Sequence, residues 1–475
     1  MVANLTKGQM LDNGVFIFPA SEELTAADVQ QMISVNQANA QIYEENMRLY
    51  VGDHQVLRKA WKQNGPDNRL VANLPHYIVD TYNGFFTGIP VKITLDDDDK
   101  ANKLLQEWHQ ANSFQDKLSE LSKQTDIYGR SFAFCYQDED SQTKVAYAAP
   151  TTALMIYDDT VAQRPLAFVR YWQTQANGLQ AEVYMAGANY LLSDGKFSGL
   201  EGQPTFPIVP AVEFFANEER QGVLDNIRTL ANSLDKVLSQ KANQVEYFDN
   251  AYMKILGVDL DANGDGLPDI DISGNQIIYS SDATSADGDI DFITKPDGDT
   301  MQEHMIDRLV NMIHQIAMVP NLNDEAFSGN SSGVALQYKL LSMRNMAANK
   351  ERKFTQSLRQ LYKVVLSTKS MQISPDAWKD LHFNFVRNLP ANLADEAQTA
   401  STLSGIVSKQ TQLKTLSIVD DPAQELEQIQ KEQDDQAQAA LRNSVSGPDY
   451  LASDGETEEE NTKPVNGFRR EDDNQ

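Results

Sequence analysis

Residues 299–354 read DTMQEHMIDRLVNMIHQIAMVPNLNDEAFSGNSSGVALQYKLLSMRNMAANKERKF. The first part predicts a helix, because Thr300 and Glu303 stand in capping-box relation and Asp299 adds negative charge at the amino end. Because the residue before a proline is biased away from helical geometry, Pro320 is expected to end this helix. Apolar residues recur every three or four positions and predict one apolar stripe: Met301, Met305, Leu309, Met312 and Ile316.

A polar break and a basic segment follow. The break is rich in small and polar residues: Phe327, Ser328, Gly329, Asn330, Ser331, Ser332 and Gly333. It is either a deformable element that changes the angle between two helices, or an ordinary loop whose serines cap the next helix. Residues 334–363 carry seven basic residues against Glu351 alone, a net charge of +6. Nothing here has the pattern of a catalytic centre, so we interpret the stretch as a mechanical part.

Length and composition bound the class of protein. A chain of 475 residues is too long for one ordinary core, so we expect roughly two to four substructures. No run approaches the ~18 uninterrupted apolar residues of a spanning helix, and MVANLTK does not resemble a signal peptide. The single cysteine, Cys135, excludes an internal disulfide and is expected to be buried and inert. These features predict no membrane contact and folding in a cytoplasm.

The formal charge of −28 argues against an ordinary nucleic-acid binder held by phosphate neutralisation. The acidic excess is concentrated, because residues 257–300 carry eleven Asp against Lys295 alone, and residues 420–475 carry sixteen acids against five bases. Together with the basic segment, these stretches favour complementary surfaces between copies or partners. The alternative is that they are solvated faces that keep the protein soluble.

The amino-terminal half predicts an α+β domain. Residues 1–20 have no clear period and are expected to form an extended arm. Thr25 and Asp28 predict the start of a helix that ends near Tyr50 before Gly52. Further helices are expected over residues 77–86, after Pro75, and over 114–128, between Ser113 and Gly129. An antiparallel sheet is expected from five β-rich runs: 132–136, 145–148, 166–172, 181–185 and 208–215.

The longest helical pattern covers residues 223–253 and would span ~45 Å. Paired with the helix over 299–318, it predicts a protruding hairpin with a small module between the two helices. The alternative is a pair of core helices in a globular domain. The segment from Asp421 is expected to be helical to about Arg442, and the acidic tail beyond it to be disordered.

Three ordered blocks carry a family resemblance: Asn73–Thr81 with Gly88–Val91, Val212–Gly222, and Asn330–Leu341 continuing to Phe354. The chain resembles the siphophage-type portal proteins of tailed bacteriophages, over roughly residues 25–420. The resemblance implies a mixed α+β, helix-rich portal fold, with a wing that holds an antiparallel sheet, a long-helix stem, a small α/β clip and a helical crown. We also expect that the protein is not an enzyme, because the sequence lacks phosphate-loop and metal-ligand patterns.

Laid onto this sequence, the resemblance divides the chain as follows: arm 1–24, wing 25–222, first stem helix 223–256, clip 257–298, second stem helix 299–318, tunnel-loop region with return to the wing 319–394, crown 395–443 and acidic tail 444–475. The tunnel loop or hinge would hold Pro320 and Phe327–Gly333.

The resemblance implies a closed, usually dodecameric, ring of copies at one capsid vertex of the virion, assembled in the host cytoplasm. Double-stranded DNA would pass through the ring during packaging and ejection. The implied partners are the large terminase packaging motor, head-completion or connector proteins, and capsid and scaffolding proteins. A wall that gripped phosphates would stall DNA, so we interpret the basic segment mainly as a contact between subunits, with DNA contact as the alternative: Lys339, Arg344, Lys350, Arg352 and Lys353.

One motif points to a different class. Oxygen-bearing residues stand at positions 1, 3, 5 and 9 of a calcium-loop template: Asp261, Asn263, Asp265 and Asp269. Position 12 is Ile272 instead of a bidentate Glu, so a turn between strands is favoured over calcium binding. No Gly-Lys-Ser/Thr phosphate loop and no metal-ligand spacing of histidines occur. The alternative function is an acidic non-enzymatic scaffold or a calcium-dependent adhesion module.

Overall fold

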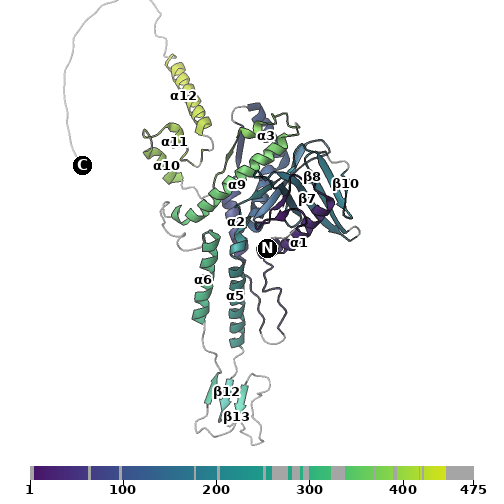
Figure 1. Cartoon of the computed structure of the whole chain (residues 1–475). Helices are drawn as coiled ribbons and strands as arrows, with labels where there is room; N and C mark the ends of the chain where they lie inside the picture. The colour runs from purple at the N-terminus through teal and green to yellow at the C-terminus, as the bar shows by residue number, and fades with distance from the viewer. Residues whose placement is uncertain are drawn as a thin grey trace, which may run out of the picture. The chain divides into compact units, whose positions relative to one another are not determined.

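The computed structural model describes residues 5–62, 66–95, 99–175, 178–200, 204–249, 253–258, 277–280, 289–292, 299–322, 337–368, 370–388, 393–416, 418–419 and 422–445 (Figure 1). The chain divides into two compact units, Met1–Leu389 and Pro390–Gln475. The first unit mixes helices and sheets, which confirms the expected fold class at that level.

Helix α1, Ala26–Val51, begins and ends where the sequence predicts. The Thr25 hydroxyl accepts a hydrogen bond from the Asp28 backbone N–H, and the Asp28 carboxylate accepts one from the Thr25 N–H. Gly52 ends the helix at φ +88°, a left-handed conformation that costs glycine little. Local capping therefore defines this helix.

Three shorter helices follow: α2 (Leu74–Thr87), α3 (Asp99–Asn112) and α4 (Phe114–Tyr128). Pro75 lies in the first turn of α2, as predicted. The expected cap of α4 is wrong, because Ser113 has φ +47° and its side chain makes no capping hydrogen bond. Gly129 does end α4, at φ +84°.

A seven-stranded sheet runs in the order β1 (Gln9–Met10), β2 (Phe16–Phe18), β6 (Ala153–Asp158), β7 (Pro165–Thr174), β8 (Gly178–Met185), β9 (Ala188–Ser193) and β10 (Lys196–Gly199). All its neighbours are antiparallel except β2 and β6. The expected amino-terminal arm is wrong for Gln9–Met10 and Phe16–Phe18, because β1 and β2 belong to this sheet. Phe16 and Phe18 are buried there against α1 residues such as Val29 and Ile33.

A second sheet has the order β11 (Ala211–Phe215), β4 (Arg130–Gln137), β5 (Thr143–Ala148), and β15 (Leu381–Asn384) pairs with β3 (Lys92–Leu95). Aromatic side chains join the two larger sheets, since the rings of Phe134 and Phe168 lie 5.4 Å apart. The predicted strands are confirmed, although the last begins at Ala211 instead of residue 208, but the expected single sheet is wrong, because β7 and β8 lie in the first sheet and β4, β5 and β11 in the second. Cys135 lies fully buried in β4, and burial raises the pKa of its thiol.

The long helical pattern after Gly222 is divided. A short 3-10 helix, η1 (Val223–Asn226), precedes α5 (Arg228–Asp249), whose 22 residues span ~33 Å instead of ~45 Å. A small sheet of β12 (Met253–Leu256), β13 (Ile277–Ser280) and β14 (Asp289–Phe292) then precedes α6 (Asp299–Ala317). Strand β12 is central, parallel to β13 and antiparallel to β14. The predicted first helix therefore extends too far, because Met253 begins a strand.

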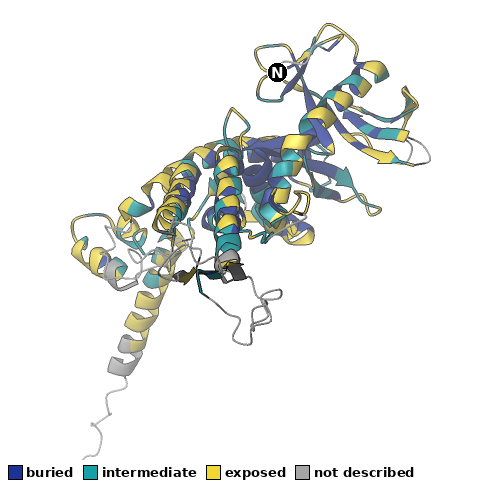
Figure 2. Cartoon of the chain, turned by 90° about the horizontal axis from the view of Figure 1, so that it is seen from below, coloured by how far each residue is buried: buried dark blue, intermediate teal, exposed yellow. Residues whose placement is uncertain are grey.

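Helix α9 (Leu341–Leu366) buries one face in the main core, and η2 (Ala377–Lys379) follows it. The second unit contains α10 (Leu393–Thr402), α11 (Lys409–Leu413) and α12 (Pro422–Val445). The described side chains of α12 are mostly exposed, whereas both the sheets and the helices of the first unit supply buried residues (Figure 2). Across the described parts of the chain, no helix combines the length and apolarity needed to cross a bilayer.

Candidate functional site

Helices α5 and α6 form an antiparallel pair. Lys241 of α5 makes an ion pair with Glu303 of α6, and Gln302 donates a hydrogen bond of 2.8 Å to Gln244. The residue numbers of the contacting pairs therefore increase along α5 as they decrease along α6, which is the antiparallel arrangement. Toward its carboxyl end α6 buries Leu309 in the main core.

The outer face of α6 carries an exposed apolar stripe. Leu309 and Ile313 point into the core, but four side chains at helical spacing do not: Met301, Met305, Met312 and Ile316, which we call the α6 stripe. Met301 is 73% exposed, and the other three are between 37% and 45% exposed. The predicted stripe therefore differs in burial, because Leu309 is buried whereas the described residues leave the other four of its members exposed.

The end of α6 is held by one side-chain contact to the backbone that follows it. Met318 leaves the helix at φ +58°, and Val319 is fully buried. Burial lowers the pKa of His314, whose Nδ1 lies 3.0 Å from the Val319 carbonyl oxygen and can donate to it. Pro320 follows the helix as predicted, at a fixed exit from the core. The remaining break residues, Phe327–Gly333, lie outside the described residues.

The basic segment does not present its cations on one surface. Lys350 is 1% exposed, and its Nζ lies 2.7 Å from Asp126 Oδ1 and 2.8 Å from Ser122 Oγ, both on α4. The prediction that Lys350 contacts DNA or another subunit is therefore wrong, since a side chain enclosed in its own core reaches neither. Burial raises the pKa of Asp126 to about 6 and lowers the pKa of Lys350.

The other predicted basic residues are at the surface or near it. Lys353 pairs with Glu218 of the same chain, and Arg352 donates a hydrogen bond of 3.2 Å to Asn349. Arg344 is exposed, and Lys339, just before α9, is half-buried. Arg344 and Arg352 are thus the predicted cations with the most exposed positions. Lys353 is less available to another molecule, because it already has an acidic partner in Glu218.

The loop that joins α1 to α2 is a feature that sequence reasoning missed. His54 Nδ1 lies 2.5 Å from Asp235 Oδ2 of α5, and both side chains are fully buried. Burial by itself would lower the pKa of His54, but Asp235 outweighs burial and raises it. Asp235 also accepts a hydrogen bond of 2.9 Å from the Ala72 N–H, so one carboxylate anchors both ends of the loop to α5.

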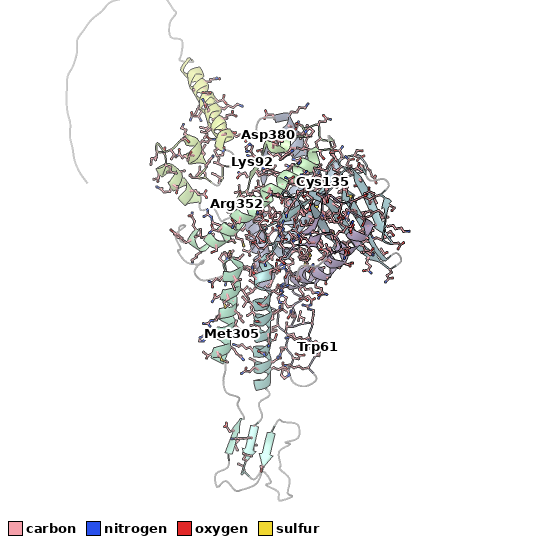
Figure 3. The ribbon with its side chains drawn as sticks, viewed as in Figure 1. Trp61, Lys92, Cys135, Met305, Arg352 and Asp380 are labelled. Atoms are coloured by element: carbon pink, nitrogen blue, oxygen red, sulfur yellow. The ribbon has the colours of Figure 1, made fainter. Side chains whose placement is uncertain are left out.

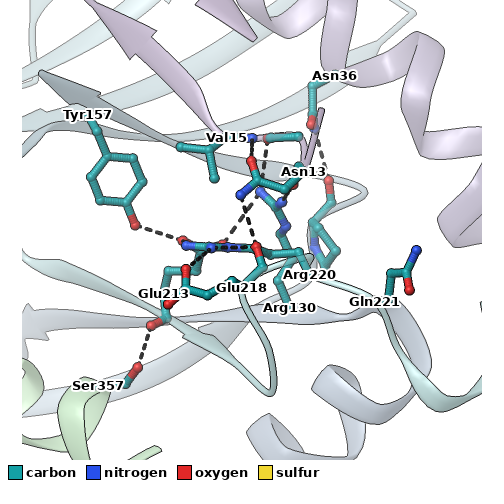
Figure 4. A network of polar contacts seen from close by, with 12 residues as sticks. Asn13, Val15, Asn36, Arg130, Tyr157, Glu213, Glu218, Arg220, Gln221 and Ser357 are labelled. Carbon is teal, nitrogen blue, oxygen red and sulfur yellow. Dashed lines mark hydrogen bonds and ion pairs between the residues drawn. The ribbon is translucent and has the colours of Figure 1, made fainter. Parts of the chain in front are cut away.

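A buried network joins distant parts of the first unit (Figure 4). Glu213 of β11 lies between Arg130 at 3.5 Å and Arg220 at 3.4 Å, and it accepts a hydrogen bond of 2.8 Å from Tyr157. Arg130 also donates to the carbonyl oxygen of Gly14 at 2.9 Å. The network therefore ties the β1–β2 connection to both larger sheets.

The candidate calcium residues lie outside the described residues: Asp261, Asn263, Asp265 and Asp269. Within the described ranges no group of three or more His, Cys, Asp or Glu side chains could hold a metal ion. The favoured turn and the alternative of calcium binding therefore both stay untested expectations from the sequence.

A family model described as phage portal protein, SPP1 Gp6-like, matches residues 30–439. The chain belongs to this portal protein family. The resemblance inferred over residues 25–420 is thereby confirmed, and the match continues some way toward the carboxyl end.

Two relatives carry the name portal protein. The portal chain is 24% identical to that of Bacillus phage SPP1 over 411 residues, which are 79% of this chain and 78% of the relative. It is 22% identical to that of Clostridium phage phiCD119 over 429 residues, which are 84% of this chain and 92% of the relative. A portal role in a bacteriophage virion follows from this membership, in a family that is in general structural.

Proposed function

We propose that this portal chain forms a closed ring, dodecameric as the resemblance implies, at one capsid vertex, and that double-stranded DNA passes through it during packaging and ejection. In this proposal the two larger sheets and α1–α4 form the wing, α5 and α6 the stem, β12–β14 the clip, and α10–α12 the crown. Family membership supports the portal role, and a ring additionally requires a surface on which neighbouring copies meet.

The α6 stripe is the observation that best supports assembly into a ring. Exposed apolar side chains scattered singly are normal, but four at helical spacing on one helix mark a contact surface. Burying one such side chain contributes roughly 1.5–3 kcal/mol, so the stripe can contribute substantially to each contact between copies. A protein that worked as a monomer would leave this surface in water.

The net negative charge of the chain supports a role as a conduit for DNA. Each copy carries a formal charge of −28, so a ring has a large negative charge. Binding to DNA gains most of its strength from cations that replace phosphate counterions, and an acidic or neutral wall lacks that grip. A wall of this kind lets a duplex slide instead of holding it.

We propose that Arg344 and Arg352 contact acidic surfaces of neighbouring copies, with DNA contact as the alternative. Surface ion pairs are screened by salt, so rings should dissociate more readily as ionic strength rises. If the stability of the rings does not depend on ionic strength, but bound DNA is lost at high ionic strength, DNA contact would be favoured.

The clip would meet the packaging motor and later the head-completion proteins, and the segment from Pro320 to Gly333 would lie beside the tunnel. Replacing Gly329 and Gly333 by Ala should impair DNA packaging more than ring assembly if the segment must deform. Equal loss of both would favour an ordinary loop.

Calcium titration of the full chain, compared with an Asp265→Asn variant, tests the candidate calcium loop.

The decisive experiment is negative-stain microscopy of the purified full chain. Rings with an axial hole are expected. Monomers at every concentration and ionic strength would count against the ring and favour an acidic scaffold or adhesion module.

A further inference from the structure

The loop between α1 and α2 lies along α5 as a fixed element. Its described residues, 52–62 and 66–73, make further hydrogen bonds to that helix beyond the Asp235 anchor. The Asn68 N–H donates to Asn243 at 2.5 Å, the Asn68 amide to Glu246 at 2.5 Å, and the Leu70 N–H to Ser239 at 2.9 Å. The loop therefore adds a second surface to α5.

That surface exposes an apolar patch. Leu57, Trp61 and Leu70, which we call the loop patch, are 42%, 74% and 45% exposed. Arg69 gives the patch a set shape, because its guanidinium lies 3.8 Å from the centre of the Trp61 ring and donates to the carbonyl oxygens of Leu57 and Lys59. A tryptophan held in this way is a preformed anchor of the kind found at protein interfaces.

The loop patch and the α6 stripe lie on opposite sides of α5. The α5 residues that contact α6 are 241 and 244, whereas those that contact the loop are 239, 243 and 246. At 3.6 residues a turn the two sets point about 180° apart around the helix. Figure 3 accordingly shows Met305 on α6 and Trp61 on the loop with α5 between them.

Two different apolar surfaces on opposite sides of one element fit a head-to-tail contact. Such heterologous contacts generate rings when the rotation closes, and each copy then uses one surface toward each neighbour. The charges agree with this pairing, since exposed Arg308 lies within the α6 stripe and Glu246 borders the loop patch.

We propose that the α6 stripe of one copy packs on the loop patch of the next copy. The inference rests on the proposed ring and names the two surfaces that meet in it. The occupant of the loop patch is therefore a second copy of this chain.

Cysteine cross-linking tests the pairing, because the only native cysteine, Cys135, is fully buried. We would prepare full-length chains with Trp61→Cys, with Met305→Cys, and with both, and treat them with a mild oxidant or a short bis-maleimide. In a ring, the double variant should give a ladder of covalent multimers up to the closed ring on a non-reducing gel. An equal mixture of the two single variants should stop at dimers, since each chain then has one reactive thiol.

Controls separate the possible failures. Val161→Cys combined with Met305→Cys places the first thiol on an exposed turn of the seven-stranded sheet and should give no ladder. Dimers from Met305→Cys alone would indicate that α6 meets α6, which would overturn the proposal.

Microscopy of the same samples distinguishes this inference from the ring itself. Rings without a ladder in the double variant, under both the oxidant and the bis-maleimide, would overturn the pairing and leave the ring standing. Absence of rings in the unsubstituted chain would overturn both. Unchanged melting of each variant confirms that the substitutions leave the fold intact.

Discussion

Lys350 Nζ of α9 lies 2.7 Å from Asp126 Oδ1 of α4, and both side chains are 1% exposed. The ammonium also lies 4.8 Å from the centre of the Phe86 ring, so α2 supplies part of its surroundings. Helices α2 and α4 are thus joined to α9, which is distant in the sequence, at one buried charge. This relationship makes Lys350 a structural residue of the basic helix.

Lys350→Met should be strongly destabilising at pH 8. Removing one partner of a buried ion pair leaves an uncompensated charge and costs about 3–5 kcal/mol. The loss should be smaller at pH 5, because burial already raises the pKa of Asp126 to about 6 and the carboxyl can then take up a proton. Urea unfolding at the two pH values measures this difference.

Arg352→Met is the matched control, since Arg352 is exposed on the same helix and should change the free energy of unfolding by less than about 0.5 kcal/mol. A double Asp126→Leu, Lys350→Met variant should recover much of the loss. Equal effects of Lys350→Met and Arg352→Met would contradict a structural role for the buried pair.

Glu213 should make the fold sensitive to acid. Burial alone would raise the pKa of Glu213, but Arg130 and Arg220 outweigh burial and leave this pKa below its ordinary value. A carboxyl with a lower pKa in the folded chain stabilises the fold above its unfolded pKa of about 4.5, and this contribution is lost as pH falls through the folded pKa. Stability should therefore fall in acid.

Glu213→Gln tests this sign. At pH 7 the free energy of unfolding of the variant should be lower by about 3 kcal/mol, because buried Arg130 and partly buried Arg220 lose their carboxylate, and this difference from the unsubstituted chain should narrow in acid. Chemical unfolding at pH 7 and pH 4 provides the measurement. Glu139→Gln, at an exposed turn, should leave both midpoints unchanged, and a constant gap at the two pH values would contradict the prediction.

Gly129→Ala should lower the free energy of unfolding by more than its backbone conformation alone explains. Gly129 has φ +84°, and an added Cβ would overlap the carbonyl oxygen of Arg220. Gly187 has φ +74° with open space around it, so Gly187→Ala isolates the backbone term of about 1–2 kcal/mol. Urea unfolding should show that Gly129→Ala loses at least about 2 kcal/mol more, because a backbone carbonyl cannot rotate away as a side chain can. Similar losses in both variants would show that the loop after β11 simply moves.

Met312→Glu should disassemble rings without unfolding the chain. Burying a charge in an apolar contact costs more than the roughly 1.5–3 kcal/mol that a methionine contributes there, so the fraction of copies in rings should fall at least about tenfold. Size-exclusion chromatography with light scattering measures this fraction, and circular dichroism follows the fold. Val161→Glu, also exposed, should leave both unchanged. Rings that survive Met312→Glu would show that the α6 stripe lies outside the contact.

The sequence by itself determined the elements whose signals are local. Thr25 with Asp28 and Gly52 set the ends of α1, because a cap is a contact between residues a few positions apart. The three blocks that resemble portal proteins likewise need no coordinates, and they predicted the family that the comparisons show.

Only the tertiary structure decided what depends on distant partners. Strand β2 has three residues and no readable period, and it becomes a strand because β6, far along the chain, pairs with it. Periodicity predicted the apolar residues of α6, but it did not predict which of them are buried and which are exposed, because that depends on the side of the helix that the core covers. Lys350 reads as one more surface cation until α4 brings Asp126 to it. In each case the free energy comes from contacts between segments remote in sequence, which a local pattern does not contain.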